Sequence, residues 1–442
     1  MLDDFAGLGT DCALEQIRVT TRAAPVAAID AVYALWQHDH ALLWAPPTGL
    51  RAVAAGSAAQ LRASGPHRIA RLHDASRRLW QSLDAAGSAD APAPRLWGGL
   101  AFAPGAAARA PWAEFGDASF VLPRLTYWSD GSRAWLQAAG RHGDASVERA
   151  LAAAHAALAR LPHDDRAGPY RAPACTIAPA DEDAWRQQVE DILEAIDAGQ
   201  VRKVVAALCA TVQFERAPSV AGVLANLRGE TGPVWRFAFT RGGATFVGAS
   251  PELLVRRRGE VVESEALAGT LAKSQGHGAD LLASTKDRSE HQFVCDGIAD
   301  ALAPLCSRID VPAAPTVREL KRLFHLATPI RGTLSRGAHV LELCERLHPT
   351  PATGGTPRDR ALEMIQTTEA TPRGWYAAPL GWFDAAGDGE LVVALRSGLI
   401  CGNSAYVHAG AGIVAGSRAD KELAETQLKQ RVLLRALGLA DG

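Results

Sequence analysis

Two strand-like runs joined by a Gly-Gly turn, VWRFAFTRGGATFVGAS (234–250), constrain the fold more than any other feature of the sequence. The runs are rich in aromatic and β-branched residues, and Gly242 and Gly243 suit the tight turn of a hairpin. A second strand pair is expected around Gly402 in GELVVALRSGLICGNSAYVHAGAGIV (389–414). Because two-residue turns join antiparallel neighbours, these runs predict largely antiparallel sheets.

A helix followed directly by a long strand opens the second half of the chain. DEDAWRQQVEDILEAIDAG (181–199) begins with acidic capping residues, ends on a glycine, and places Trp185, Val189, Ile192 and Ile196 on one face. The run VRKVVAALCATVQF (201–214) follows and is strand-like. Helices mixed with hairpins indicate an α/β or α+β fold, in which helices flank largely antiparallel sheets.

A stretch that contains proline and aspartate, LPHDDRAGPYRAPACTIAPADED (161–183), is the best candidate boundary in the chain. It interrupts the periodic pattern for longer than an ordinary loop. We therefore expect residues 1–170 to form the N-terminal scaffold of the fold and residues 171–442 to form the catalytic region. In the first part, the GG of LWGGLAF (96–102) marks a close-packed backbone position.

The balance of charge excludes several kinds of partner. The chain of 442 residues has 46 basic and 48 acidic residues, a formal net charge of −2, and no block of like charges. Nucleic acid and anionic membranes are bound by basic patches, so neither is an expected partner. We expect a small-molecule substrate instead.

No segment of the sequence predicts export or membrane insertion. The N-terminus MLDDFAGLGTDCALEQ (1–16) is acidic and lacks the basic and apolar regions of a signal peptide. No stretch approaches the roughly 20 apolar residues that span a bilayer. The seven cysteines stand singly, without CxxC spacing, so we expect buried free thiols and neither a disulfide framework nor a structural zinc site. These features predict a cytoplasmic protein.

The last predicted helix, DKELAETQLKQRVLLRALG (420–438), carries a charged stripe. Glu422, Glu425 and Lys429 recur at steps of three and four, so they project from one face. Such a stripe is most often a solvated face. The segment AGAGIVAGSRAD (409–420) before it is interpreted as a glycine-rich turn that lets backbone amides approach an anionic ligand, which favours a binding site.

A second acidic helix is predicted in LLASTKDRSEHQFVCDGI (281–298), where Asp287, Glu290 and Val294 share a face. The HExxH spacing of zinc proteases does not occur. Carboxylates on two helices suit Mg²⁺, because that ion takes only one or two protein carboxylates, keeps waters, and lets an anionic substrate complete its shell.

Three further residues carry charge next to apolar strands. Lys203 starts the strand KVVAAL, where burial would lower its pKa and make it a base, and Glu252 in SPELLVRRR would move the opposite way and become an acid. Arg396 falls within the strand-like run LVVALRSGL and could bind a substrate carboxylate through its planar guanidinium. His325 and His348 are weaker candidates. Each of these residues also has a purely structural interpretation.

A series of motifs runs in order from Lys203 to Lys429. They are KVV (203–205), GASPELL (248–254), EALAGT (265–270), ASTKDRSEHQFV (283–294), HLATP (325–329), LHPTPATGGTP (347–357), RGWYAAPLGW (373–382), GDGELVVALRS (387–397), AGAGIV (409–414) and KELAETQLK (421–429). Together they resemble the chorismate-utilising enzymes, the family of isochorismate, salicylate, anthranilate and aminodeoxychorismate synthases. LWGGLAF and ASFVLPRL extend a weaker resemblance into the N-terminal half, which implies one large integrated domain.

The resemblance implies a magnesium site and a chorismate site. In the family, Mg²⁺ binds a chorismate carboxylate, and the matching motifs place its ligands at Glu290 and Glu425, with Glu422 acting through water. The matching positions that would hold chorismate are Arg396 and Lys429 for the second carboxylate, Gly269, Thr270, Gly410 and Gly412 for backbone contacts, and His325 and Tyr376 for the pocket wall.

The resemblance also implies the reaction. The KVV lysine resembles the base that activates water in the isochorismate and salicylate synthases, so Lys203 points to water as the nucleophile. Glu252, which matches the SPE glutamate, would protonate the departing C4 hydroxyl while water attacks C2, giving isochorismate. The sequence departs from the family at Leu208, where the pattern KVVLAR or KVVLSR has an arginine, and this puts in doubt any charge network beside Lys203.

Several alternatives stay open at this stage. Salicylate synthase would add elimination of pyruvate on the same scaffold. Anthranilate or aminodeoxychorismate synthase would lack the lysine at position 203 and would need a glutaminase subunit, which we therefore do not expect. A catalytically inactive chorismate-binding protein is a third alternative. The family resemblance favours a monomer, and the pathway that uses the product is not readable from the sequence.

Overall fold

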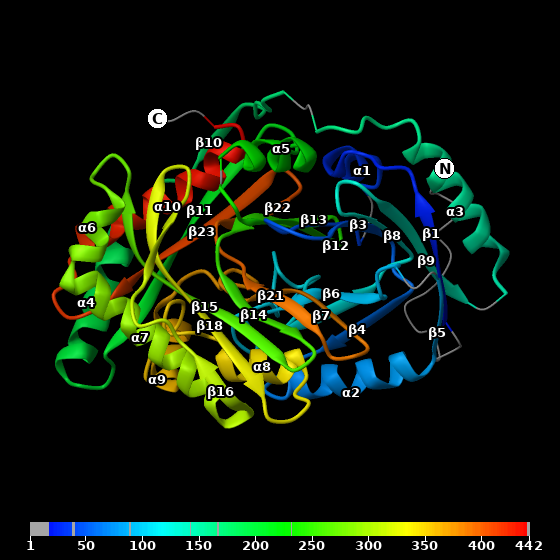
Figure 1. Ribbon diagram of the computed structural model, residues 1–442. Helices are drawn as coiled ribbons and strands as arrows, with labels where there is room; N and C mark the ends of the chain where they lie inside the picture. Colours follow the sequence, from blue (N-terminus) through cyan, green and yellow to red (C-terminus); the bar gives the residue numbers. More distant parts are fainter. Residues whose placement is uncertain are drawn as a thin grey trace.

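The computed structural model describes residues 17–37, 40–87, 90–141, 143–165, 168–230 and 232–439. Within these ranges the strands form two large sheets, one of 13 strands and one of 10, with helices packed against them (Figure 1). The N-terminal segment 1–16, where we expect no leader, lies outside the described residues.

The larger sheet contains the predicted strand that carries Lys203. Its strands, in spatial order, are β10 (Cys175–Ile177), β11 (Lys203–Phe214), β23 (Ser404–Ile413), β22 (Ser397–Cys401), β13 (Ala244–Ser250), β12 (Trp235–Arg241), β2 (Leu42–Ala45), β3 (Arg51–Ala55), β8 (Leu125–Ser129), β9 (Ala134–Arg141), β1 (Ile17–Ala24) and β5 (Leu83–Ala86), with β19 (Gly355–Thr356) paired to β11. Among the described strands, β1 and β5 form the one parallel pair. The prediction of largely antiparallel sheets is confirmed.

The smaller sheet is built in the same way. Its order is β16 (Cys306–Asp310), β18 (Leu323–Leu334), β15 (Val261–Ala272), β14 (Leu253–Arg258), β21 (Gly389–Val393), β20 (Pro379–Asp384), β6 (Arg95–Leu100), β7 (Ala118–Leu122) and β4 (Ala59–Ala63), with β17 (Thr316–Glu319) paired to β18. Each sheet therefore contains strands from residues 1–170 and from residues 171–442. The assignment of the first part as scaffold stays a prediction.

The predicted hairpin at residues 234–250 forms as expected. β12 and β13 pair from Trp235 with Ser250 to Arg241 with Ala244. Gly242 and Gly243 between them have φ angles of 55° and 79°. Positive φ at both turn positions matches the right-handed twist of the strands and is available to glycine without a steric penalty.

Aromatic side chains fill part of the space between the sheets. Trp44, Trp97, Trp112, Trp128 and Trp375 are among the largest fully buried side chains. They pack in one cluster with residues of both sheets. The close packing predicted at the GG of LWGGLAF is confirmed, because a Cβ on Gly98 would lie 1.9 Å from the carbonyl oxygen of Ser119.

The helices cover the outer faces of the two sheets (Figure 1). They are α1 (Ile29–Leu35), α2 (Arg68–Gln81), α3 (Ala145–Leu158), α4 (Glu182–Asp197), α5 (Val220–Glu230), α6 (Gly278–Ala283), α7 (Thr285–Leu302), α8 (Val340–Leu347), α9 (Arg358–Thr368) and α10 (Ala419–Ala436). α10 packs on β23, whereas α7 packs on β15 and β18. The predicted caps and face of α4 are confirmed, since the Asp181 side chain accepts from the Ala184 amide and Trp185, Val189 and Ile192 are buried. None of the helices in the described ranges is long and apolar enough to cross a membrane.

Two local predictions are wrong. Arg396 does not lie within a strand: β21 ends at Val393, β22 begins at Ser397, and Arg396 occupies the bend between them with a φ of 50°. Gly410 and Gly412 do not form a turn, because both lie in β23, and the turn before α10 comes later, at Gly416 with a φ of 80°.

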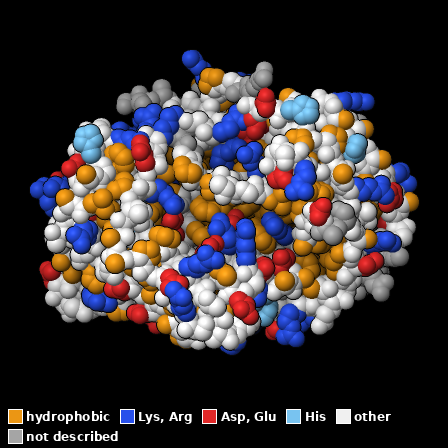
Figure 2. Space-filling model, viewed as in Figure 1, with side chains coloured by type: hydrophobic (Ala, Val, Ile, Leu, Met, Phe, Trp, Pro, Cys, Tyr) orange, Lys and Arg blue, Asp and Glu red, His pale blue; other side chains and the backbone are white. Residues whose placement is uncertain are grey.

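The surface and the cysteines agree only partly with expectation. Acidic and basic side chains are interspersed over the face seen in Figure 2, as the nearly balanced charge predicts.

The described cysteines are free, but only Cys295 and Cys344 are buried, and Cys401 is exposed. The expectation of buried thiols is therefore wrong for Cys401, which lies at the tip of the β22–β23 hairpin. Cys12 lies outside the described residues.

Candidate active site

One cavity, with a volume of about 140 Å³, brings together the residues predicted to bind or act on a ligand, apart from His348, whose Nε2 lies 2.8 Å from the carbonyl oxygen of Phe102. They are Lys203, Glu252, Gly269, Thr270, Glu290, His325, Tyr376, Arg396, Gly410, Gly412, Glu422, Glu425 and Lys429. The main walls come from β11 and β23 of the larger sheet, β15 and β18 of the smaller sheet, and helices α7 and α10. The cavity therefore lies where one end of each sheet meets the two acidic helices.

Lys203 is held at the start of β11 by strands on both sides. It pairs with Thr356 of β19, and the next residue, Val204, pairs with Ile413 of β23. Its side chain is buried, and its Nζ lies 2.7 Å from Oε1 of Glu290 on α7. The side chain of Lys203 thus reaches across the cavity from the larger sheet to the first acidic helix.

Gly412 makes the room that Lys203 needs. A Cβ built on Gly412 would lie 2.7 Å from Cε of Lys203 and 3.2 Å from Oε1 of Glu290. Such contacts are too close for a real side chain, so glycine at this position allows the lysine to cross the neighbouring strand. A larger residue at position 412, near the end of β23, would displace the Lys203 side chain.

Glu252 lies between β13 and β14 and is 3% exposed. Burial, followed by the nearby carboxylate of Glu265, raises the pKa of Glu252 to about 8, while the charges of Arg396 and Lys203 act in the opposite direction. A carboxyl group with this pKa is protonated at neutral pH. Glu252 can therefore donate a proton inside the cavity.

The carboxylates of α7 and α10 form an acidic wall. Glu290 comes from α7, and Glu422 and Glu425 come from successive turns of α10, so the predicted shared face of α10 is confirmed. Burial and the charge of Glu425 raise the pKa of Glu422. Burial opposes ionisation of Glu425, but Lys429 and Arg396 outweigh it and hold the pKa of Glu425 below its usual value.

This donor set fits a hard cation. All three groups offer carboxylate oxygens, which Mg²⁺ prefers. Within the described part of the chain, no three His, Cys, Asp or Glu side chains form a compact cluster that would hold a metal ion by themselves. The arrangement suits an ion that takes few ligands from the protein and completes its shell with water and an anionic ligand.

Cationic side chains lie beside the acidic wall. Lys429 donates to Glu425 over 2.7 Å and to the carbonyl oxygen of Gly410 over 2.9 Å. Arg396 is partly buried, and its charge acts on Glu252, Tyr376 and Glu425. A φ of 50° is costly for a residue with a side chain, and such strain concentrates at functional sites. These two cations are placed to bind an anionic group within the cavity.

Thr270 and His325 form a polar contact on the smaller sheet. Oγ1 of Thr270 lies 3.1 Å from Nδ1 of His325, and that nitrogen lies 3.2 Å from the carbonyl oxygen of Gly269. Burial lowers the pKa of His325 to about 3, so the imidazole is neutral. Gly269 has a φ of 74° at a bulge between β15 and β18, which turns its backbone towards the cavity.

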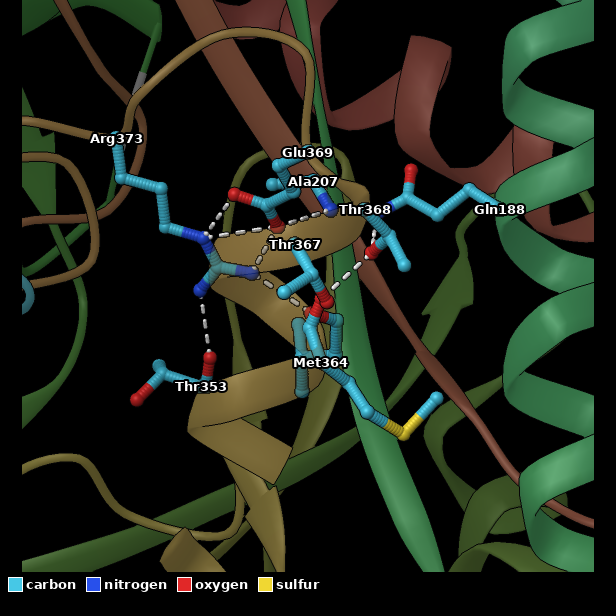
Figure 3. A network of polar contacts seen from close by, with 9 residues as sticks. Gln188, Ala207, Thr353, Met364, Thr367, Thr368, Glu369 and Arg373 are labelled. Atoms are coloured by element: carbon cyan, nitrogen blue, oxygen red, sulfur yellow. Dashed lines mark hydrogen bonds and ion pairs between the residues drawn. The ribbon is translucent and has the colours of Figure 1, made fainter. Parts of the chain in front are cut away.

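Arg373 is a cavity residue that sequence reasoning missed. Figure 3 shows its guanidinium between Glu369 and the backbone of Thr353. It binds the Glu369 carboxylate through two nitrogens, and it donates to the carbonyl oxygens of Thr353 over 2.8 Å and Val205 over 2.7 Å. Arg373 stands in the RGWYAAPLGW motif, but Glu369 lies outside that motif and the backbone partners Thr353 and Val205 are distant in sequence, so the motif alone did not predict this network.

Glu369 completes the connection to β11. Its Oε1 accepts a hydrogen bond of 3.1 Å from the amide of Ala207 (Figure 3). The pair formed by Glu369 and Arg373 therefore fastens the end of α9 to the strand that carries Lys203. Lys286 and Asp287 at the start of α7 also line the cavity; Asp287 was expected on the acidic face of α7, whereas Lys286 was not singled out.

Leu208, which stands where the family pattern has an arginine, packs among apolar side chains. It is partly buried and packs against an apolar cluster that includes Val204, Ile365 and Ile413. Its carbonyl oxygen accepts from Nε2 of Gln430. The leucine side chain thus joins the packing of α4, α9 and the sheet.

Comparison with known proteins assigns the chain to a family. Residues 11–438 match the model of the chorismate binding enzymes. The chain therefore belongs to the chorismate-utilising enzymes, and the expected fold and substrate class are those of this family.

Individual relatives narrow the class further. The chain is 38% identical over 432 residues to the salicylate biosynthesis isochorismate synthase of Pseudomonas aeruginosa, covering 93% of this chain and 88% of the relative. It is 35% identical to the isochorismate synthase MenF of Bacillus subtilis, over 78% of this chain and 75% of the relative. The crystal structure of MenF from Escherichia coli, the menaquinone-specific isochorismate synthase, superposes with a TM-score of 0.78 at 27% identity, covering 96% of this chain and 95% of that one. The chain is thus an enzyme that resembles isochorismate synthases.

Proposed function

We propose that the protein is an isochorismate synthase that converts chorismate to isochorismate and depends on Mg²⁺. The observation that carries the proposal is that Lys203 and Glu252 line the same cavity and that both are buried. A lysine can take a proton from water, and a carboxyl group with a pKa of about 8 can give one. The similarity to named isochorismate synthases supports the same reaction.

In the proposed reaction Lys203 accepts one proton and Glu252 donates one. Lys203 accepts a proton from water as the water oxygen bonds to C2 of the ring. The ring double bonds shift, the bond between C4 and its hydroxyl oxygen breaks, and Glu252 protonates that oxygen so that it leaves as water. One water is consumed and one is released, so the reaction is an isomerisation.

Glu290 and Glu425 are proposed to hold Mg²⁺ directly, and Glu422 is proposed to do so through water. Their carboxylate oxygens and their position on one wall support this role. The bound ion would supply positive charge to a chorismate carboxylate and so orient the substrate. Arg396 and Lys429 would bind the second carboxylate, which adds positioning without any further proton transfer.

The remaining cavity residues shape the substrate site. Gly269, Thr270, Gly410 and Gly412 offer backbone contacts, and the side chains of His325 and Tyr376 form part of the wall. Tyr376 stacks on His408 with ring centroids 5.2 Å apart, and burial raises its pKa to about 12, so it stays neutral. We expect no glutaminase subunit, because the nucleophile is water. The monomeric state and the cytoplasmic location stay predictions.

The experiment that tests this function is product analysis by chromatography. Purified protein is incubated with chorismate, once with Mg²⁺ and once with a chelator. Isochorismate formed only in the presence of Mg²⁺ is the expected result. Salicylate with pyruvate would instead identify a salicylate synthase, and unchanged chorismate in both reactions would contradict an active enzyme.

A further inference from the structure

We propose that the ion pair between Glu265 and Arg318 is a positioning unit for Glu252: it fixes the backbone beside Glu252 and keeps the proton on its carboxyl group. This inference rests on the proposed function, in which Glu252 is the acid. Neither residue of the pair was predicted from the sequence, and the proposed catalytic steps do not use either of them directly.

Arg318 connects the pair to the backbone of the proposed acid. It lies in β17 and donates two hydrogen bonds, of 2.6 Å and 2.7 Å, to the two carboxylate oxygens of Glu265 in β15. Nη1 of Arg318, which makes the 2.7 Å bond to Glu265, also donates over 3.1 Å to the carbonyl oxygen of Pro251, the residue before Glu252. A planar guanidinium can make such contacts together, whereas a lysine ammonium cannot reproduce their geometry.

Other hydrogen bonds hold Glu252 in the same place. Its amide donates over 3.2 Å to Oγ of Ser250, and its carbonyl oxygen accepts over 3.1 Å from the amide of Val393. With the Arg318 contact, the backbone is fixed on both sides of Glu252. The position of its carboxyl group in the cavity therefore depends partly on the Glu265–Arg318 pair.

The negative charge of Glu265 raises the pKa of Glu252, although Glu265 does not line the cavity. Glu265 is 8% exposed, and Arg318 is partly buried. The groups whose charge acts on Glu252 are the carboxylate of Glu265 from β15, the side chain of Lys203 from β11, the guanidinium of Arg396 from the bend after β21, and the phenol of Tyr376 before β20. The guanidinium of Arg318 from β17 contacts the neighbouring backbone at Pro251. Glu265 is the negative neighbour of Glu252 in this set, and a negative neighbour favours the protonated form of a carboxyl group.

The test compares the pH dependence of kcat in three variants. Glu265→Gln removes the negative charge, so the alkaline limb of the profile, where Glu252 loses its proton, should move down by about one pH unit. Glu265→Asp keeps the charge, so the limb should stay at the wild-type pH. Glu263→Gln is the matched control, because Glu263 is on the same strand but pairs with Arg256, and its limb should not move.

Arg318→Lys tests positioning without relying on the fold of the Glu265 variants. It keeps the positive charge but cannot bind both Glu265 oxygens and the Pro251 carbonyl. We expect kcat to fall by about tenfold with KM for chorismate unchanged, a loss that corresponds to about 1.4 kcal/mol in the barrier. An unchanged kcat in Arg318→Lys, or an unmoved limb in folded Glu265→Gln, would overturn the proposal.

A readout without turnover separates this inference from the proposed function. In the folded protein Glu252 keeps its proton up to about pH 8, whereas in the unfolded chain it ionises near its ordinary pKa. The gain in melting temperature from Glu252→Gln should therefore grow with pH and level off near pH 8. In the Glu265→Gln background it should level off at lower pH, even if the protein does not convert chorismate; the same levelling pH in both backgrounds would contradict the inference.

Discussion

Nζ of Lys203 lies 2.7 Å from Oε1 of Glu290, so the proposed base contacts a proposed metal ligand directly. The two residues come from β11 and α7, which are 87 positions apart in sequence at this contact. Gly412 leaves the space for this contact. The geometry therefore places the proposed sites of proton transfer and of metal binding in one corner of the cavity.

Replacement of Lys203 should stop the reaction. Lys203→Ala removes the group that takes the proton from water, and we expect turnover to fall by a factor of about 100 to 10,000. The measurement is the initial rate of isochorismate formation. Lys273→Ala is the control, because Lys273 is a partly exposed lysine paired with Glu319 away from the cavity; an equal loss in both variants would contradict a specific role for Lys203.

Replacement of Glu425 should weaken the binding of Mg²⁺. Glu425→Gln removes a negative oxygen donor, and we expect the Mg²⁺ concentration for half-maximal activity to rise by about tenfold or more. Calorimetric titration of Mg²⁺ in the presence of chorismate gives an independent measure. Glu190→Gln on the exposed face of α4 should leave the affinity unchanged. Identical Mg²⁺ affinity in Glu425→Gln would remove Glu425 from the metal site.

The rate should fall as the pH rises through about 8. The pKa of Glu252 is raised to about 8, mainly by burial, so the carboxyl group is protonated below that pH and ionised above it. In the proposed reaction Glu252 is the acid, so only its protonated form would be active. A profile of kcat against pH tests this prediction. If Glu252→Asp retains the wild-type kcat and its alkaline limb lies at the wild-type pH, the result would argue against Glu252 as the proton donor.

Arg396 should be intolerant of a change to lysine. Both residues have a Cβ and would suffer the same backbone cost at a φ of 50°, so the change isolates the side chain. Loss of the planar guanidinium should raise KM for chorismate by about tenfold or more. Arg418→Lys on the exposed start of α10 serves as the control, and a wild-type KM in Arg396→Lys would show that Arg396 does not bind a carboxylate.

The Glu369–Arg373 pair should contribute to stability. Glu369→Ala leaves the Arg373 guanidinium buried without its carboxylate, which should lower the free energy of unfolding by about 3 to 5 kcal/mol. Glu363→Ala breaks an exposed pair on the same helix and should cost about 1 kcal/mol or less. Urea denaturation measures both changes. Similar losses in the two variants would mean that the buried network of Figure 3 is not a structural support.

Helices and hairpins were predictable where residues close together in the sequence determine them. The hairpin at Gly242 and Gly243 and the buried face of α4 follow from residue spacing, and the structure has both. Apart from His348, the site residues that the motifs predicted line a single cavity in the folded chain. Short-range periodicity and motif matches therefore predicted which residues line this cavity, whereas the roles of these residues stay predictions.

The errors and omissions have physical reasons. Arg396 bends the chain at a positive φ without a glycine or proline to mark it, so a strand was expected there. Gly410 and Gly412 resemble turn glycines, but they are needed in β23 because a Cβ would collide with Ala206 and Lys203. Contacts such as those of Arg373 join segments far apart in sequence, and only the folded chain reveals them.

The most direct test of the central claim is to follow the oxygen of water into the product. The protein is incubated with chorismate and Mg²⁺ in water enriched in heavy oxygen, and mass spectrometry locates the label. We predict isochorismate that carries the heavy oxygen in its C2 hydroxyl, with label incorporation lost in Lys203→Ala together with turnover. Isochorismate whose C2 hydroxyl is unlabelled would contradict the activation of water by Lys203.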